Sequence, residues 1–431
     1  MQEQEQGEQE QIDVTSDDLH LIRRIVRGLR RHTRRIYRRS AKRSRRIFNR
    51  LTRPLKKLAL LVCRPILRYI KIESDLIVFE SFFGRYISDS PLALFENLDH
   101  EKYRCFFIVN KPHKFKEYPT LKRGSLKALY YLSKAKIIVG NSRMTLNWEK
   151  KEGQVYLQTW HGTPLKRLVY DLTAYDMPIA DSFEEYCEIF SQDVVRWDYL
   201  FSSCPYASEK FRSAFRFDGE ILEVGYPRNH KLYHHTNENI VKIKEKLGIP
   251  TEKRVILYAP TYRDNQNDGV GNYYFHDHLD YELLNVQLED TVILVRYHYI
   301  IKQKNVLDYE NVIDVTDYQS LNDLYLISDI LVTDYSSVFF DYSILKRPFF
   351  FFTPDLEEYE EDLRGFYLDM NHDFPTKPVA TTADLIEQIK RVDMFDFATF
   401  FEAYNPPENI KCLTKTLELV DRLCGTEGDR G

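Results

Sequence analysis

The sequence lacks the features that mark secreted and membrane-spanning proteins. Its longest apolar run near the N-terminus, LALLVC at residues 58–63, is far shorter than the ~20 apolar residues that a membrane span needs. The first eleven residues, MQEQEQGEQEQ, are acidic and polar, so we expect no secretory signal. The six cysteines are widely spread and none are in CxxC spacing, which argues against a disulfide framework and favours a reducing cytoplasm.

Several motifs that are typical of cofactor binding or of a catalytic nucleophile are also missing. The sequence has no P-loop, no GxGxxG, no GxSxG and no DxD pair in a convincing strand context. Metal-ligand spacing is absent, because His234 and His235 lie in a polar stretch without partners. We therefore expect no cofactor and no metal centre, and the sequence leaves open whether a divalent metal is required.

Charge is distributed very unevenly along the chain. Residues 19–72 contain 20 lysines and arginines and no acid, whereas residues 1–18 contain seven acids. The remainder, residues 73–431, holds 41 basic and 58 acidic residues, a net charge of -17. A basic arm is thus joined to an acidic body, and we expect residues 1–18 to be a disordered acidic tail.

The basic arm has the periodicity of an amphipathic helix. Its apolar residues recur at steps of three, four and seven, starting with Ile22, Ile25, Val26 and Leu29, and arginines occupy the other face. Pro54 and Pro65 interrupt the pattern. We predict a helical membrane-association arm over residues 19–72, since anionic lipid attracts such a helix. Nucleic acid, a protein partner or a solvated helix are the alternatives.

The body alternates short apolar runs with helical stretches. Such near-continuous apolar strands between helices predict parallel sheets covered on both faces. The first set of strands is expected at 76–81, 105–110, 136–142, 155–160, 199–204 and 221–225. A charged helix at 237–250 follows, and the second set is expected at 254–260, 291–298, 311–316, 329–334 and 348–352.

We therefore predict an α/β fold with two Rossmann-like, doubly wound domains that face a cleft. The N-terminal domain should span residues 73–235 and the C-terminal domain residues 236–431. In such sheets, ligands bind beyond the carboxyl ends of the strands. Polar turns that directly follow strands are therefore the candidate functional segments.

The first such turn is TWHGTPLK, residues 159–166. Thr163 and Pro164 suit the start of a helix, and Gly162 allows close backbone approach. His161 would then stand beside free helix N–H groups, where a base could remove a proton from an attacking hydroxyl. Lys166 adds positive charge. The alternative is a structural histidine in a hydrogen-bonded turn.

The second turn is VTDYSSVFFDYS, residues 332–343. A strand leads into Asp334, and a helix is expected after Ser336 and Ser337, whose hydroxyls and N–H groups could hold a phosphate. Asp341 cannot itself favour phosphate, so we expect it to orient a ligand hydroxyl or a basic neighbour. Ordinary helix capping is the alternative.

The remaining candidates carry positive charge. Arg296 and His298 in LVRYHY would point the same way if their strand persists, and together they match a diphosphate that gains charge as it leaves. YAPTYR offers Thr261 and Arg263 after a strand. GYPRNH places Arg228 after another. Each could instead be structural.

Taken in order, TWHGTPLK, GYPRN, YAPTYR, RYH and TDYSSVFFDYSILKRP resemble the motifs of the CDP-glycerol glycerophosphotransferases, the teichoic acid primases and polymerases of bacterial cell walls. The likeness covers roughly residues 75–425. It implies a GT-B-like fold and transfer of a polyol phosphate from a CDP-polyol to a hydroxyl of a polyprenyl-diphosphate-linked saccharide, with release of CMP. Family members act at the cytoplasmic face of the membrane, so we expect a peripheral location there.

The resemblance also implies roles for individual residues. His161 matches the family's proposed general base, and His298 with Arg296 matches a second essential region near the donor diphosphate. The donor-binding segment corresponds to Thr333, Asp334, Ser336, Ser337 and Asp341. One departure is His230, where an acid is expected after YPRN.

Several readings stay open from the sequence. A GT-B nucleotide-sugar glycosyltransferase is the first alternative, because a fold alone does not decide a function. A nucleic-acid-binding protein that works through the arm is the second, although the acidic body would repel a polyanion and we expect no nucleic acid as partner. The choice between glycerol and ribitol, between primase and polymerase, and the oligomeric state cannot be read from the residues.

Overall fold

The computed structural model describes residues 67–173, 180–263, 266, 273–298, 301–303, 309–357, 359 and 365–425. The predicted acidic tail and nearly all of the basic arm lie outside these residues. Within the described part, no helix combines the length and the apolar character that a bilayer crossing requires.

The first half of the body is built on a seven-stranded parallel sheet. Its strand order is β3-β2-β1-β4-β5-β6-β7, so the order reverses between β1 and β4. The strands are β1 (Glu73–Glu80), β2 (Arg104–Val109), β3 (Thr120–Lys122), β4 (Ala135–Gly140), β5 (Val155–Gln158), β6 (Tyr199–Ser202) and β7 (Glu220–Glu223). The last five residues of β1 are all buried, as expected for a strand covered on both faces.

The second half contains a five-stranded parallel sheet in the order β12-β10-β8-β13-β14, which reverses between β8 and β13. Its strands are β8 (Arg254–Ala259), β10 (Thr291–Val295), β12 (Val312–Asp314), β13 (Ile330–Thr333) and β14 (Phe349–Phe351). A separate two-stranded parallel pair joins β9 (Tyr273–Tyr274) to β11 (Ile301–Gln303). All eleven predicted strands are present, and the α/β fold with parallel sheets is confirmed.

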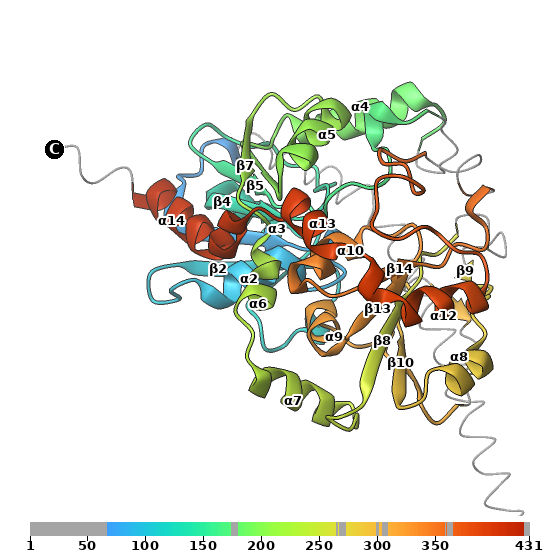
Figure 1. The fold of residues 1–431 in the computed structure, drawn as a ribbon. Helices are drawn as coiled ribbons and strands as arrows, with labels where there is room; N and C mark the ends of the chain where they lie inside the picture. The colour runs from blue at the N-terminus through green and yellow to red at the C-terminus, as the bar shows by residue number, and fades with distance from the viewer. Residues whose placement is uncertain are drawn as a thin grey trace, which may run out of the picture. The chain divides into compact units, whose positions relative to one another are not determined.

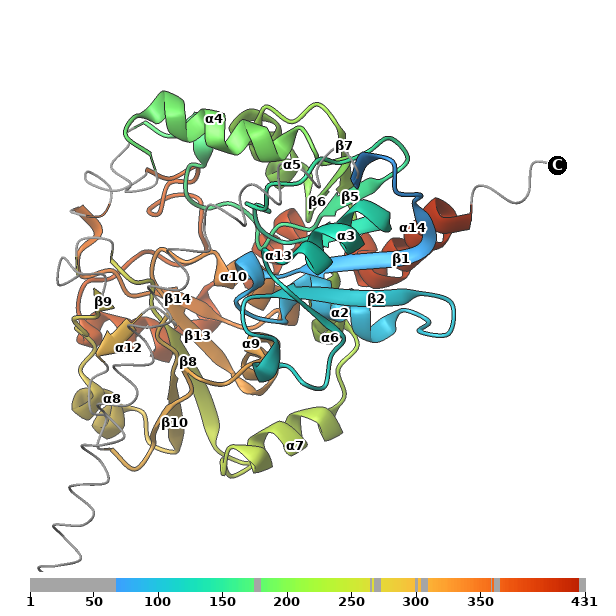
Figure 2. The same cartoon turned by 180° about the vertical axis from the view of Figure 1, so that it is seen from behind.

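Helices connect the strands and cover the sheets (Figures 1 and 2). In the first half they are α2 (Asp89–Asn97), α3 (Leu126–Lys134), α4 (Phe183–Val194), α5 (Pro205–Phe215) and α6 (His230–Tyr233). The later ones are α7 (Asn237–Lys246), α8 (Tyr281–Gln287), α9 (Leu321–Ile327), α10 (Val338–Tyr342), α12 (Thr382–Lys390), α13 (Phe397–Tyr404) and α14 (Cys412–Gly425). The predicted linking helix is α7, which starts at a capping box formed by Thr236 and Asn239.

The C-terminal helix α14 crosses back to the first sheet. Its Leu413 and Val420 share a core with Ile77 and Phe107 of the first sheet, and Asp421 accepts a hydrogen bond from the Tyr103 hydroxyl at 2.5 Å. The red helix accordingly lies beside the blue strands in Figure 1. Sequence order alone placed this segment with the second sheet, because an apolar helix face does not say which core it joins.

Two local predictions were wrong. No helix begins at Thr163: Lys166 instead forms an antiparallel bridge with Phe366, and the Arg167 N–H donates to the Gly365 carbonyl. The backbone groups of this turn pair with residues 365–366 instead of forming helical hydrogen bonds. Sequence periodicity cannot reveal such a long-range pairing. The strand of LVRYHY also ends early, at Val295, so Arg296 and His298 lie in the loop beyond it.

Candidate active site

The turn after β5 packs directly against the turn after β13. An ideal Cβ built on Gly162 would lie 3.2 Å from the Ser337 Oγ and 3.9 Å from the Arg228 Nη2. Gly162 also has a φ of +154°, which L side chains rarely adopt. The predicted need for glycine is thus explained by the close approach of Ser337, and the contact brings the first candidate turn onto the second.

His161 is held in one tautomer at this contact. Its Nδ1 lies 2.7 Å from the Asn141 carbonyl oxygen, which can only accept, so Nδ1 carries the proton and donates. The imidazole stacks on the Trp160 ring with centroids 4.3 Å apart. The side chain remains exposed to solvent. Nε2 is therefore left as the basic nitrogen.

The electrostatic surroundings keep this imidazole neutral. Although the residue keeps contact with solvent, protein atoms packed around its ring desolvate it and lower the pKa of His161. The Asn141 hydrogen bond and the Asp89 carboxylate raise this pKa, and the Arg228 guanidinium lowers it. The net direction is down from the ordinary 6.5. At neutral pH, His161 is consequently available as a base.

Trp160 explains how the chain presents this histidine. Its backbone has a φ of +51°, which is uncommon for a bulky residue, and its ring is buried against Phe211 and Phe215. The turn sends one ring into the core and leaves the next one, His161, outside. A strained backbone of this kind is common at functional sites.

Arg228 links the turn after β7 to the helix α10. Its guanidinium donates to the Asp341 carboxylate at 2.8 Å and to the Asp89 Oδ1 at 3.3 Å, and Asn229 donates to the other Asp341 oxygen at 2.6 Å. The two acids raise the pKa of Arg228 although burial opposes them. Asp341 thus pairs with a basic neighbour, which is one of the two arrangements expected for it.

Asp89 was missed by the sequence analysis. It is the first residue of α2 and has a φ of +65°. No local motif marks it, because its partner Arg228 lies 139 positions away. From the sequence alone, an aspartate at the start of a helix is indistinguishable from the acids that commonly occupy the first turn of helices.

His298 and Arg296 lie in the loop beyond β10. The His298 ring faces Tyr262, with centroids 4.6 Å apart. Arg296 donates to the carbonyls of Val315 and Tyr318, the latter at 2.6 Å. Among the residues that the structure describes, no carboxylate lies at hydrogen-bonding distance of Arg296, although Asp317 attracts it through space.

Positive charge gathers around His298. Burial, followed by the positive charges of Lys166, Arg296 and Arg85, lowers the pKa of His298 to about 4. Arg85 follows β1 in a turn where Phe82 and Phe83 both have positive φ. Arg85 was not among the predicted site residues. Cations from both halves of the body therefore act on one neutral imidazole, which is an environment that attracts phosphate.

Other predicted donor-binding residues are engaged with one another. The buried Asp334 accepts from the Thr261 N–H at 2.9 Å and from Arg263 at 2.8 Å. Arg263 also donates to Asp355 at 2.6 Å, and the Thr333 hydroxyl donates to the Ala259 carbonyl at 2.7 Å. These contacts fix the loops beyond β8 and β13.

The remaining predicted residues differ in accessibility. Thr163 is buried and its hydroxyl lies 2.7 Å from that of Ser203. The Lys166 ammonium lies 4.9 Å from the Tyr359 ring centroid. Ser337 precedes α10, but its hydroxyl makes no capping bond. Thr163 is thus tied into the first half of the body.

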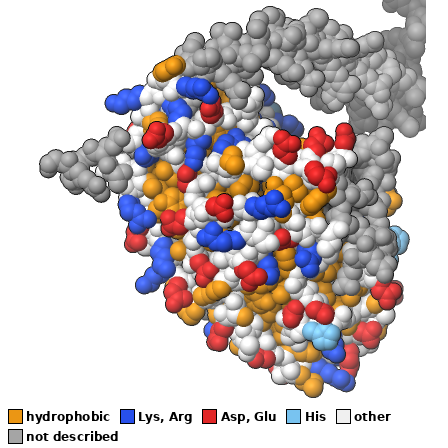
Figure 3. Space-filling model, turned by 90° about the horizontal axis from the view of Figure 1, so that it is seen from above, with side chains coloured by type: hydrophobic (Ala, Val, Ile, Leu, Met, Phe, Trp, Pro, Cys, Tyr) orange, Lys and Arg blue, Asp and Glu red, His pale blue; other side chains and the backbone are white. Residues whose placement is uncertain are grey.

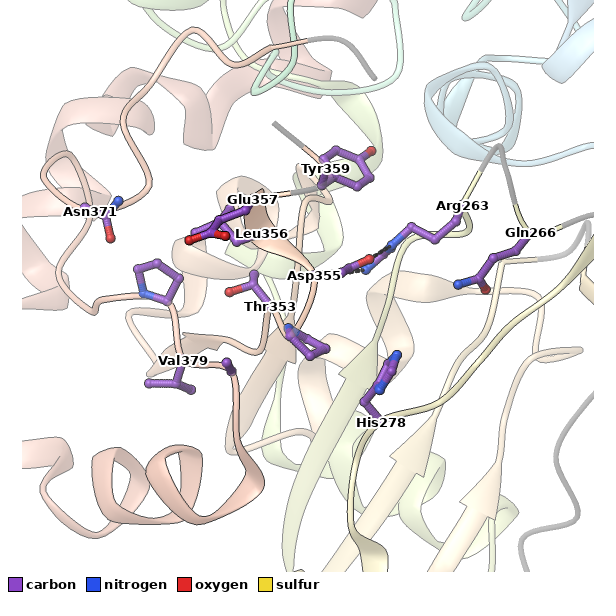
Figure 4. Close-up of a pocket in the computed structure, with 13 residues that line it drawn as sticks. Arg263, Gln266, His278, Thr353, Asp355, Leu356, Glu357, Tyr359, Asn371 and Val379 are labelled. Atoms are coloured by element: carbon purple, nitrogen blue, oxygen red, sulfur yellow. Dashed lines mark hydrogen bonds and ion pairs between the residues drawn. The ribbon is translucent and has the colours of Figure 1, made fainter. Parts of the chain in front are cut away.

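A pocket of about 600 Å³ opens beyond the carboxyl ends of β8 and β14 (Figure 4). Arg263 and Asp355 pair across its wall, and Glu357, Asn371 and His278 contribute further polar groups. Its volume is in the range of small-molecule sites. In the part of the chain that the structure covers, no group of three or more histidine, cysteine or acidic side chains could hold a metal ion.

Comparison with solved structures identifies the class of protein. The wall teichoic acid polymerase TagF matches with a TM-score of 0.79 and 36% identity, over 89% of this chain and 99% of that chain. A histidine-to-asparagine variant of TagF soaked with CDPG matches with a TM-score of 0.78. The fold, with its histidine turn at facing strand ends, thus defines an enzyme of the glycerophosphotransferase class.

Sequence comparison narrows this class to a family. The teichoic acid poly(glycerol phosphate) polymerase of Bacillus spizizenii is 43% identical over 328 residues, 73% of this chain and 83% of that protein. The teichoic acid glycerol-phosphate transferase of Staphylococcus aureus is 42% identical over 74% of this chain and 84% of its own. The chain belongs to the CDP-glycerol:poly(glycerophosphate) glycerophosphotransferase family, whose model matches residues 63–398.

Proposed function

We propose that the protein transfers glycerol phosphate, or a related polyol phosphate, from a CDP-polyol to a hydroxyl of a membrane lipid-linked acceptor during the synthesis of teichoic acid or a related cell-surface polymer. The observation that carries this proposal is the contact between Gly162 and Ser337, which sets a neutral histidine beside the turn expected to bind the donor. The soaked CDPG in a TagF structure supports CDP-glycerol as the donor.

In the proposed reaction, His161 is the general base. The acceptor oxygen forms a bond to the β-phosphorus of the donor while its proton passes to Nε2 of His161. The bond from that phosphorus to the oxygen bridging to CMP breaks, and CMP leaves with the electron pair. The Nδ1 hydrogen bond to Asn141 holds the ring in the required tautomer.

The diphosphate of the donor is proposed to lie among Arg85, Lys166, Arg296 and His298. The three cations, Arg85, Lys166 and Arg296, come from three separate loops, so they can approach several phosphate oxygens at once. They would also stabilise the charge that develops on departing CMP. Ser336 and Ser337 contribute hydroxyls from the turn before α10.

The polar pocket is proposed to receive a hydroxyl-rich part of a substrate, because Asp355 and Glu357 in its lining repel phosphate. The two sheets fit the GT-B-like arrangement that the resemblance implies. The role of Arg263 and Asp334 in this arrangement is to hold the pocket wall and the Thr261 loop in place.

The basic arm is proposed to hold the enzyme on the cytoplasmic face of the membrane, beside its lipid-linked acceptor. Confinement of enzyme and acceptor to one surface raises the rate at which they meet. The support for this role is the arm's cationic amphipathic pattern.

Product analysis tests the whole proposal. The full-length protein is incubated with CDP-glycerol or CDP-ribitol and a lipid-linked saccharide, and the products are weighed by mass spectrometry. A phosphodiester product together with CMP is expected. A glycosidic product from a nucleotide sugar would favour the glycosyltransferase alternative, and a salt-dependent gel shift without CMP release would favour nucleic-acid binding.

A further inference from the structure

Arg143 is a buried guanidinium without a hydrogen-bonding partner. Its side chain follows β4 and is 8% exposed. It stacks on the Phe190 ring of α4, with its central carbon 4.2 Å from the ring centroid. In the described part of the chain, none of its five N–H donors meets a protein acceptor at hydrogen-bonding distance, and its nitrogens keep some contact with solvent.

The segment that carries Arg143 is held rigidly by α4. The neighbouring Met144 N–H donates to the Asp193 carboxylate at 3.1 Å, and Arg196 donates to the Met144 carbonyl at 2.8 Å. Asp193 also pairs with Arg196 and accepts from the Trp197 indole at 3.2 Å. Asp193 thus makes its hydrogen bonds to other groups and attracts Arg143 only through space.

A buried cation in this state is costly unless something pairs with it. Burial lowers the pKa of Arg143, which expresses how poorly the site supports the bare charge. Two other buried arginines of this protein have carboxylate partners: Arg228 has Asp341, and Arg263 has Asp334. The missing partner at Arg143 therefore points to an anion that arrives from solution.

The location of Arg143 indicates which anion. It lies two residues beyond Asn141, whose carbonyl fixes the His161 ring. A continuous row of ring contacts leads from Phe190 through Phe215 and Trp160 to His161. These elements all belong to the first half of the body, whereas the turn before α10 and His298 belong to the second. Arg143 thus belongs to the same half of the body as the proposed base.

We propose that Arg143 and Phe190 form a phosphate-binding subsite for the acceptor. The inference rests on the proposed function for its substrate: an acceptor that ends in a polyol phosphate carries a phosphodiester near its free hydroxyl. Arg143 offers a planar fork that can bind two phosphate oxygens at once, and Phe190 holds that fork in place. The subsite selects a phosphate-bearing acceptor over a neutral polyol.

The test measures binding to the full-length protein by calorimetry. The probes are glycerophosphoglycerol, which is a soluble phosphodiester, glycerol as the neutral comparator, and CDP-glycerol. The variants are Arg143→Met, which keeps an apolar stem on Phe190, and Arg143→Lys, which keeps the charge but loses the fork. Arg216→Met is the matched control, because this exposed arginine stacks on the Tyr170 ring at 3.8 Å in the same half of the body.

We expect Arg143→Met to weaken glycerophosphoglycerol binding roughly 10- to 100-fold, with a smaller loss in Arg143→Lys. Arg216→Met should bind as the wild type does, and CDP-glycerol affinity should change less than about twofold in every variant. The Tm of Arg143→Met should equal or exceed that of the wild type, because an unpaired buried charge has been removed.

Three results would overturn the proposal: unchanged glycerophosphoglycerol binding in Arg143→Met, an equal loss of CDP-glycerol binding, or a fall in Tm by several degrees or a failure to fold. The last would mean that Arg143 is structural. Binding is measured without turnover, so the proposed function can fail independently of this subsite. It fails if the wild-type protein releases no CMP from any CDP-polyol, even when Arg143→Met weakens glycerophosphoglycerol binding as expected.

Discussion

A single imidazole carries most of the chemistry proposed for this protein. The Nδ1–H of His161 donates a hydrogen bond to the Asn141 carbonyl, and its Nε2 has no protein partner among the described residues. The neighbouring glycine lets a second turn approach within van der Waals distance. At the scale of single residues, the site thus depends on the hydrogen bond between His161 and Asn141 and on the absence of a side chain at Gly162.

Replacement of His161 by alanine should reduce kcat at least ~100-fold, because general-base catalysis contributes about that much or more. The exposed side chain contributes little to the stability of the fold, so the circular dichroism spectrum and the Tm should stay close to those of the wild type. CMP release from CDP-glycerol provides the rate. Near-normal turnover in the variant would remove His161 from the mechanism.

The pH dependence of kcat/KM should report the same imidazole. The pKa of His161 lies below 6.5, and the base form exists above that pKa. Activity should therefore be lost only as the pH falls below 6.5. Asp89→Asn removes a carboxylate that raises this pKa, so its acidic limb should move to lower pH. A limb above pH 7 in the wild type would contradict the assignment.

Gly162→Ala should lower kcat/KM roughly 10- to 100-fold, because its Cβ would push the His161 turn away from Ser337 by a few tenths of an ångström. Gly248→Ala is the matched control. Gly248 has a φ of +70° and no atom near its missing Cβ, so this variant should lose about 1 kcal/mol of stability and keep its activity. Equal activity in both variants would mean that the contact is unimportant.

At the scale of elements, the two halves of the body are tied together by charge and by backbone pairing. Arg228 reaches from the turn after β7 to Asp341 in α10, and Lys166 pairs with Phe366. These links cross from the loops of one sheet to those of the other. They explain why the turn that carries His161 is extended rather than helical.

Asp341→Ala should destabilise the protein by roughly 3 kcal/mol, because it leaves Arg228 buried with only the longer contact to Asp89. The free energy of unfolding in urea measures this loss. Glu209→Ala, which breaks an exposed ion pair with Lys210, should change it by less than about 0.5 kcal/mol. Similar losses in the two variants would show that the Arg228 link is not stabilising.

At the scale of the whole molecule, charge separates the arm from the body. On the face of the body shown in Figure 3, acidic and basic side chains are interspersed with hydrophobic ones, whereas residues 19–72 contain bases without acids. An anionic membrane therefore has more to attract it in the arm than on this face.

Removal of residues 1–66 should abolish binding to liposomes that contain anionic lipid, measured by co-sedimentation. The truncation keeps the contact between Ile70 and Lys151 and should leave transfer to a soluble acceptor largely intact. Binding of the intact chain should weaken as salt is raised. Equal liposome binding by the truncated and intact chains would refute the membrane role of the arm.

The sequence by itself determined the layers of this protein and most of its candidate turns. Apolar runs such as those of β1 and β8 must be buried on both faces, and a parallel sheet brings the polar residues that follow its strands to one edge. Local periodicity and strand-end position placed His161, Ser337 and His298 in loops that follow strands, as the structure shows, because a strand and its direction can be read from a short segment.

Tertiary structure alone decided the partners. Asp89 meets Arg228, α14 joins the first sheet, and residues 163–168 pair with a distant segment instead of forming a helix. Each depends on two segments far apart in the sequence, whose meeting is set by the packing of whole elements. Arg143 shows the same limit: only the folded chain reveals that its guanidinium has no hydrogen-bonding partner among the described residues.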